Sequence, residues 1–215
     1  MIEAWTSVKS FTKKDGSGLP QSDQDRNPTV DFKREKRSNE THLSTTDPDA
    51  RLYKKGDGAK SRLCYLDHGL RENRNGLVVD ATTTLAGGTA ESEAAPIMAT
   101  RNIQSAGATL GADNGYDAAD VVKHLRDQGV TPHVDQKKNS AIDGRTTRHA
   151  RYAVSIKKRK LVEETFGSGK TIGPLSKVRF VGLAKVRART TLTFAAYTLT
   201  RMASIFGWRL SAVLA

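Results

Sequence analysis

The stretch Arg62–Leu85, RLCYLDHGLRENRNGLVVDATTTL, carries the strongest fold signal in the chain. Residues 62–70 and 76–85 are rich in residue types that favour β-strands. The segment between them, RENRNG, ends in an Asn-Gly pair that is typical of a tight hairpin turn. The sequence therefore predicts an antiparallel hairpin here.

The residues after this hairpin alternate between helix and strand patterns. The glycine pair Gly87 and Gly88 breaks the chain, and Thr89 can cap the helix that follows. Gly129 lies where a second helix would end, and Pro132 places the next strand at a sheet edge. We expect helices at 90–101 and from Asp117 or Ala118 to Gln128, and short strands at 108–111 and 131–134.

Two more helices are expected in the C-terminal third. The first covers 152–166 and is ended by Gly167. The second covers 189–206 and has apolar residues at i, i+3, i+4 and i+7, which predicts that this stripe packs against the body. The stripe consists of Leu192, Ala195, Ala196, Leu199, Met202, Ile205 and Phe206.

The N-terminal part has a different character. Residues 1–8, MIEAWTSV, predict a strand, whereas residues 9–60 are polar and rich in turn-forming types. We expect 9–60 to be a long polar loop or hairpin insertion. The order of elements predicts one α/β domain with a mixed sheet over residues 1–206, followed by a tail at 207–215.

The charge is strongly localised. The chain has 215 residues with 35 Lys+Arg and 23 Asp+Glu, a formal net charge of +12. Residues 137–189 alone hold 15 Lys+Arg and 3 Asp+Glu, so the whole excess lies in this basic part. A localised excess favours a phosphate backbone as partner, with an acidic membrane surface second. The alternative is a solvated basic face or a disordered basic tail.

Composition also excludes several classes of protein. The N-terminus has no signal-peptide core, and no apolar run reaches the roughly 18 residues that a membrane span needs. The single cysteine, Cys64, excludes a disulfide framework and a Cys-based zinc site, and we expect it in the core. We therefore expect a reduced, cytoplasmic protein without a membrane anchor.

Asp113 is the first candidate for chemistry. It follows a short predicted strand, precedes a helix and has Gly111 and Gly115 beside it. Ligand sites in α/β sheets gather at the carboxyl ends of strands, and a carboxylate there can bind Mg²⁺. The alternative, which this feature alone favours, is a turn or helix-capping aspartate.

Glu163 is the second candidate, because cations surround it. Arg159 lies four residues before it and Lys170 seven residues after it, which places all three on one face of a continuous helix. A metal-binding acid beside cations that hold phosphates suits phosphoryl transfer. The alternative is an ordinary surface Arg–Glu pair.

Four other polar residues carry weaker signals. Asp67 and Asp80 lie in predicted strands, where burial beside a partner explains an aspartate as well as function does. His133 and His149 lack metal-ligand spacing, and we interpret both as structural or phosphate-contacting.

Five segments in order resemble insertion-sequence transposases of the DDE type, with the IS-four/IS-five group as the nearest relatives. The resemblance runs from Met1 to about Met202. The segments are EKRSNETHLSTTDPDARLYKKG, GLVVDATTTLAGGTAE, GADNGYD, IDGRTTRH and KRKLVEETFGSGK.

The resemblance implies a ribonuclease-H-like fold in which three acidic residues bind two Mg²⁺ or Mn²⁺ ions. It implies that Asp113 is the second acid and Glu163 the third, both catalytic and metal-binding. Arg159 and Lys170 match the family's Tyr-x2-Arg-x3-Glu-x6-Lys signature, whose tyrosine position holds Ile156. The implied partners are transposon-end and target DNA, with a possible homo-oligomer and a nucleoid location. The DNA-binding residues expected are Arg159, Lys170, Lys157, Lys158, Lys160, Arg145 and Arg148.

The sequence also departs from the family. The family's first acid lies in an Asp-Gly-Thr motif just before the segment that matches MIEAW, and this chain begins after that motif. Where relatives read Phe-Gly-Trp-Ile-Lys, this chain reads FGSGK, and we expect the small residues to fray the helix that aims Lys170. We therefore expect a truncated catalytic domain with impaired activity alone. The alternatives are a non-catalytic DNA-binding relic and a poorly folded product.

Overall fold

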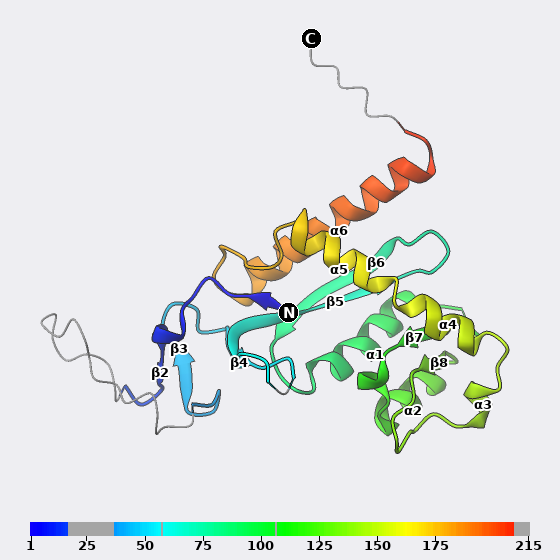
Figure 1. Ribbon diagram of the computed structural model, residues 1–215, viewed down its shortest axis with the longest axis horizontal. Helices are drawn as coiled ribbons and strands as arrows, with labels where there is room; N and C mark the ends of the chain where they lie inside the picture. Colours follow the sequence, from blue (N-terminus) through cyan, green and yellow to red (C-terminus); the bar gives the residue numbers. More distant parts are fainter. Residues whose placement is uncertain (17–36, 57, 106, 209–215) are drawn as a thin grey trace, which may run out of the picture.

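The chain folds into a mixed α/β structure, seen here in a computed structural model that describes residues 1–16, 37–56, 58–105 and 107–208 (Figure 1). Its described elements are short at the N-terminus and longer after residue 62. In order they are β1 (Ile2–Glu3), η1 (Val8–Ser10), β2 (Phe11–Lys13), β3 (His42–Ser44), β4 (Arg51–Tyr53), β5 (Arg62–Arg71), β6 (Val78–Leu85), α1 (Ala90–Asn102), β7 (Thr109–Ala112), η2 (Asn114–Tyr116), α2 (Ala119–Asp127), β8 (Thr131–Val134), α3 (Gly144–Thr147), α4 (Tyr152–Arg159), α5 (Val162–Thr171) and α6 (Leu183–Ile205).

The predicted hairpin is confirmed and forms the centre of the main sheet. β5 pairs antiparallel with β6, from Tyr65↔Leu85 to Arg71↔Val78. Gly76 in the connecting turn has φ 78°, a left-handed conformation that glycine adopts without strain. β4 pairs with the start of β5 on the same side as β6, and β1 pairs with Cys64 and Tyr65 on the opposite side.

A second, two-stranded sheet carries Asp113 at its end. β7 and β8 pair in parallel, and η2 and α2 connect them. Within the described residues β8 pairs only with β7, so it is an edge strand as Pro132 predicts. Gly129, which ends the segment after α2, has φ 71° as expected for a helix C-cap glycine.

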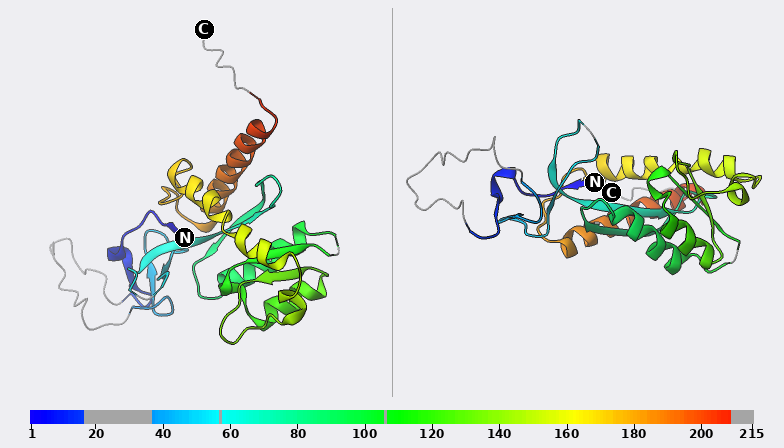
Figure 2. Two further views of the ribbon diagram at one scale, coloured as in Figure 1. Left: turned by 45° about the vertical axis from the view of Figure 1, so that its right-hand side comes forward. Right: turned by 90° about the horizontal axis from the view of Figure 1, so that it is seen from below.

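Helices cover both faces of these strands. In the right-hand view of Figure 2, α4 and α5 run along one side of the sheet strands and α1 along the opposite side. The largest buried cluster includes Tyr65 of β5 together with Val186 and Phe194 of α6, and Cys64 is fully buried as predicted. Thr89 makes no side-chain capping bond to α1, so that part of the prediction is wrong.

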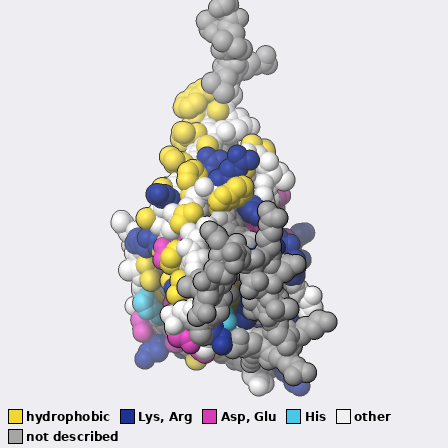
Figure 3. All heavy atoms as spheres, turned by 90° about the vertical axis from the view of Figure 1, so that its left-hand side faces the viewer, with side chains coloured by type: hydrophobic (Ala, Val, Ile, Leu, Met, Phe, Trp, Pro, Cys, Tyr) yellow, Lys and Arg dark blue, Asp and Glu magenta, His cyan; other side chains and the backbone are white. Residues whose placement is uncertain are grey.

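The predicted packing face of the last helix is also wrong. Leu192 and Leu199 of the expected stripe are 66% and 64% exposed, whereas Thr190 and Phe194 are buried. Figure 3 shows hydrophobic side chains at the surface in the upper part of the molecule, where the end of α6 lies. The helix turns a threonine-rich face inward because Thr190 donates a hydrogen bond to Asp67 at 3.0 Å. The hydrogen bond to the Asp67 carboxylate stabilises the fold more than burial of Leu192 and Leu199 would.

The single helix predicted at 152–166 is two helices. α4 ends at Arg159 and α5 begins at Val162, so the chain bends between them. α5 then continues through the glycines to Thr171, and the expected fraying before Lys170 does not occur. A Cβ on Gly169 would lie 3.3 Å from Leu175 and 3.5 Å from Phe194. This glycine therefore lets α5 pack closely on the core, which outweighs its low helix propensity.

The described part of residues 9–60 is more ordered than a polar loop. It contains the β2–β3 hairpin and β4, while residues 17–36 lie outside the described residues. Two of its aspartates cap α6, because Gly182 N–H donates to Asp47 at 3.2 Å and Leu183 N–H donates to Asp49 at 2.9 Å. Of the expected tail, Trp208 stacks on Phe206, and 209–215 also lie outside the described residues.

Candidate active site

A cavity of about 1070 Å³ opens between β5, β7, α1, α4 and α5. Four of the residues that the sequence predicts to be catalytic or DNA-binding line it, and they come from three separate segments. The fold thus brings two acids and two cations to one place, although their roles stay predictions. These residues are Asp113, Arg159, Glu163 and Lys170.

Asp113 lies directly after β7 and begins η2. Its side chain accepts a hydrogen bond from the N–H of Gly115 at 2.8 Å. The capping role that the sequence favoured is therefore present. The residue is exposed and also lines the cavity. One oxygen holds the turn, so the other is free to face a ligand.

Glu163 lies in the first turn of α5. It is exposed, and within the described residues its carboxylate has no hydrogen-bond or ion-pair partner. The positive end of a helix dipole stabilises an ionised carboxylate at this position. Glu163 lines the cavity and can therefore turn toward a cation there.

The two cations are held differently. Arg159 belongs to α4 and pairs with Asp135, Nη2 to Oδ2 at 2.8 Å. The Arg–Glu surface pair given as the alternative therefore does not form, and Arg159 does not share one continuous helix with Glu163. Its Nε is buried without a partner in the described residues, and its side chain lines the cavity. Lys170 lies on the same helix as Glu163, seven residues on, and is exposed. Because α5 is continuous from Glu163 to Lys170, these two residues keep the expected spacing of about two turns.

Asp67 lies in the cavity wall but serves the structure. It accepts hydrogen bonds from Thr83 at 2.8 Å and Thr190 at 3.0 Å. Burial raises the pKa of this carboxyl, while the two threonines and the charge of Lys170 act in the opposite direction. The interpretation of Asp67 as a buried, partnered aspartate agrees with these contacts.

Glu91 is a site residue that the sequence reasoning missed. A Cβ on Gly115 would lie 2.9 Å from Asp113 Oδ1 and 3.9 Å from Glu91 Oε2, so the two carboxylates lie close together. Burial raises the pKa of nearby Tyr116, and the charges of Glu91 and Asp113 add to this. No local pattern distinguishes Glu91, because an acid in the first turn of a helix, here α1, is common.

The donor set fits a hard divalent cation in its chemistry. Carboxylate oxygens are the ligands that Mg²⁺ and Mn²⁺ prefer, and Asp113 and Glu163 offer them across one cavity. Within the described ranges no three His, Cys, Asp or Glu residues are grouped closely enough to form a complete ligand cluster. An ion held by the pair would take its other ligands from water or a phosphate.

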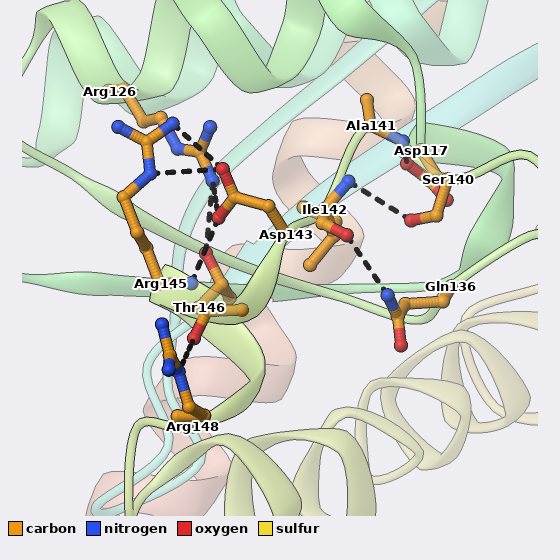
Figure 4. Close-up of polar contacts among 11 residues, drawn as sticks. Asp117, Arg126, Gln136, Ser140, Ala141, Ile142, Asp143, Arg145, Thr146 and Arg148 are labelled. Atoms are coloured by element: carbon orange, nitrogen blue, oxygen red, sulfur yellow. Dashed lines mark hydrogen bonds and ion pairs between the residues drawn. The ribbon is translucent and has the colours of Figure 1, made fainter.

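The predicted DNA-binding residues other than Arg159 and Lys170 fall into two groups. Around α3, Arg145 and Arg126 pair with Asp143 at 2.8 and 3.0 Å, and Arg148 Nε donates to Gly144 O at 2.9 Å (Figure 4). The hydrogen bond from Arg145 lowers the pKa of Asp143 to about 2. The second group is exposed on and just after α4, and consists of Lys157, Lys158 and Lys160.

The weaker candidates have structural contacts. His133 is buried, with Nδ1 at 2.7 Å from Ser155 Oγ, and its ring lies 5.2 Å from that of His149. Asp80 accepts a hydrogen bond from Asn102 at 2.8 Å and lies 3.8 Å from Arg101. These contacts support the structural interpretation of His133 and Asp80.

Comparison with protein families shows what the chain is similar to. Residues 40–199 match the family model described as the transposase DDE domain. Neither a curated protein nor a solved structure matches the chain. Among the described residues no helix is long and apolar enough to cross a membrane.

Proposed function

The chain belongs to the family of transposase DDE domains, and from this we propose that it binds DNA at the cavity that holds Asp113 and Glu163. The proposal includes the finer points that the resemblance implies. These are an IS-four/IS-five origin, a ribonuclease-H-like arrangement, two Mg²⁺ or Mn²⁺ ions, self-association on DNA and a nucleoid location.

The observation that carries this proposal is the charge pattern of one cavity. Asp113 and Glu163 would hold a divalent cation, while the Arg159 guanidinium and Lys170 would hold phosphate oxygens beside it. A divalent ion bound there would supply Lewis-acid stabilisation of a phosphodiester under attack. Arg159 and Lys170 would position the phosphate and balance its negative charge.

We propose that DNA bound at the cavity continues along the surface of α4, and we call this course the DNA path. Lys157, Lys158 and Lys160 are exposed, and Arg159 between them points into the cavity wall. Their side chains can therefore contact phosphates outside the cavity while Arg159 contacts one inside it. Arg145 and Arg148, which are exposed near α3, would extend the same surface.

Salt-dependent DNA binding tests this path. We expect the triple substitution of Lys157, Lys158 and Lys160 to Gln to reduce the slope of log affinity against log salt by about 2 to 3 for duplex DNA. Fluorescence anisotropy with a labelled duplex between about 50 and 200 mM salt measures this slope.

A second triple variant provides the control. Lys9, Lys60 and Lys123 are exposed in other parts of the chain, and their substitution to Gln removes the same charge. We expect it to change the slope by less than about 1, because long-range charge effects are screened by salt. Equal effects of the two triples, or no salt dependence in the unsubstituted chain, would contradict the DNA path.

A second candidate function is DNA binding without strand cleavage. It is favoured by the absence of a three-residue ligand group in the described ranges. We propose that this chain alone cleaves DNA poorly, because the acids that line the cavity do not form a three-residue ligand group among the described residues. Mn²⁺-dependent cleavage that is robust in the unsubstituted chain and lost in Asp113→Asn would refute impaired activity and establish the catalytic function.

A further inference from the structure

An exposed tryptophan lies among cations beside the main sheet. Trp5, which follows β1, is 47% exposed. The Nζ of Lys177 lies 5.5 Å from the centroid of the Trp5 ring, and the guanidinium carbon of Arg179 lies 5.6 Å from it. Both distances are within the range at which a cation attracts an aromatic ring. The two cations border the ring without covering all of it, so part of the indole stays open to a ligand.

The backbone holds this group on a fixed support. Glu3 and Lys177 form a parallel β-bridge, in which the N–H of Val178 donates to Glu3 O at 3.1 Å. Val178, between the two cations, is buried. Because side chains alternate along extended chain, the residues two positions after each member of the bridge share its outward direction. Trp5 and Arg179 are those residues, so they project from the same outer face as Lys177.

The surroundings of the ring carry an excess of positive charge. Arg62 and Lys177 both pair with Glu3, and Lys177 Nζ lies 3.2 Å from Glu3 Oε1. Arg179 has no carboxylate partner among the residues that the structure describes. Three cations and one carboxylate leave a net charge of +2 at this face. The group therefore favours an anionic ligand that also offers a flat, apolar surface to the indole.

We propose that Trp5 stacks on an unpaired base of a single-stranded nucleic acid, while Lys177 and Arg179 hold the phosphates beside that base. Every base has a π-face that can stack on an aromatic side chain, and cations along the strand bind its backbone. A base inside a duplex is already stacked and paired, so the ligand differs from the duplex expected on the DNA path. In Figure 1, β1 lies beside the N-terminus at the centre of the view, whereas α4 lies to the right. The inference goes beyond the proposed function in both its site and its ligand.

Tryptophan fluorescence tests the proposal directly, because the chain has two tryptophans. Only Trp5 emits in the variant Trp208→Phe, and only Trp208 emits in Trp5→Phe. We expect a single-stranded oligothymidylate of ten nucleotides to quench the emission of Trp5 and to leave that of Trp208 unchanged. An oligomer of ten abasic sites carries the same phosphates without bases, so it should not quench Trp5.

Affinities of alanine variants measure the stacking contribution. Trp5→Ala should weaken binding of labelled oligothymidylate by about 5- to 150-fold, the range that stacking of one base contributes, as measured by fluorescence anisotropy. Trp208 is 63% exposed and stacks on Phe206 near the end of α6. Trp208→Ala is therefore the matched control, and its affinity should change by less than about twofold.

The salt dependence of the same binding tests the role of the cations. Arg179→Gln should lower the slope of log affinity against log salt by about 0.7, the value for one phosphate contact on a single strand. Lys123 is exposed on α2, and Lys123→Gln should leave the slope unchanged. An equal change in the two variants would contradict a phosphate contact at Arg179.

Two further probes identify the class of ligand. Oligouridylate of the same length should bind within about threefold of oligothymidylate, because the proposed contacts are to base and phosphate and not to sugar. Decaglutamate has a similar charge without bases and should bind at least about tenfold more weakly. A larger difference between the two oligonucleotides, or equal affinity for decaglutamate, would contradict recognition of an unpaired base with its phosphates.

Three outcomes of the fluorescence and affinity measurements would overturn the proposal: no quenching of Trp5 by oligothymidylate, equal quenching by the abasic oligomer, or equal losses of affinity in Trp5→Ala and Trp208→Ala. A thermal melt of each variant shows that it is folded. The triple lysine variant of α4 separates the two proposals, because it should lose salt-dependent duplex binding and keep the quenching of Trp5 by the single strand.

Discussion

Lowering the pH from 7 to 5 is expected to weaken the fold through one buried histidine, His68. This residue of β5 is 5% exposed, and its Nε2 lies 2.8 Å from the hydroxyl oxygen of Thr84. Burial lowers the pKa of His68 from 6.5 to about 4, with a further contribution from the positive charge of the chain's amino group. The folded state therefore keeps this imidazole neutral at pH values where an unfolded chain protonates it.

The sign and size of the effect follow from these two pKa values. Between pH 6.5 and 4 the unfolded state binds more protons at this residue, so the free energy of unfolding falls as pH falls. The loss due to His68 is about 2 kcal/mol between pH 7 and 5, and about 3 kcal/mol once the pH is below 4.

Urea unfolding of the unsubstituted chain and of His68→Gln, at pH 7 and pH 5, measures the effect. Glutamine can still bond Thr84 but does not titrate, so the variant should lose about 2 kcal/mol less than the unsubstituted chain over this range. His124→Gln, at an exposed position, should lose as much as the unsubstituted chain. Equal pH dependence in all three proteins would refute a buried neutral His68.

Two further predictions concern the packing of α6. Thr190→Val removes the hydrogen bond to Asp67 and should cost about 1 to 3 kcal/mol of unfolding free energy, whereas Thr190→Ser, which keeps the hydroxyl, should lose less. Phe194→Ala should cost about 3 to 5 kcal/mol and Leu199→Ala less than about 0.5, both measured by urea unfolding. The reverse order of the last two costs would mean that α6 packs through the stripe predicted from the sequence.

Local sequence signals were sufficient for the β5–β6 hairpin and the β7–α2–β8 unit. The Asn-Gly turn, Gly129 and Pro132 each fix a backbone feature within a few residues of themselves. Their effect does not depend on distant packing. The sequence therefore predicted these elements to within about two residues.

The elements that were mispredicted depend on contacts between distant segments. The buried face of α6 is set by Asp67, 123 residues before Thr190, and no periodicity of the helix alone reveals that partner. Gly169 stays helical because Leu175 and Phe194 lie against it. The caps that Asp47 and Asp49 provide for α6 are equally remote in sequence.

The candidate site also combines residues that local motifs predict with contacts that only the fold creates. The motifs around Asp113 and Glu163 predicted four site residues, and all four line one cavity. They are Asp113, Arg159, Glu163 and Lys170. The bend after α4 gives Arg159 a different partner, Asp135, which helical spacing could not anticipate. Glu91 also joins the site only through the fold.

Anomalous diffraction from crystals soaked in Mn²⁺ tests the central claim most directly, because it locates the metal relative to individual carboxylates. The account predicts a manganese peak at bonding distance from oxygens of both Asp113 and Glu163, and no such peak in crystals of Asp113→Asn. A peak bound to Glu163 without Asp113, or one found only at other carboxylates, would contradict the claim that these two acids share a cation.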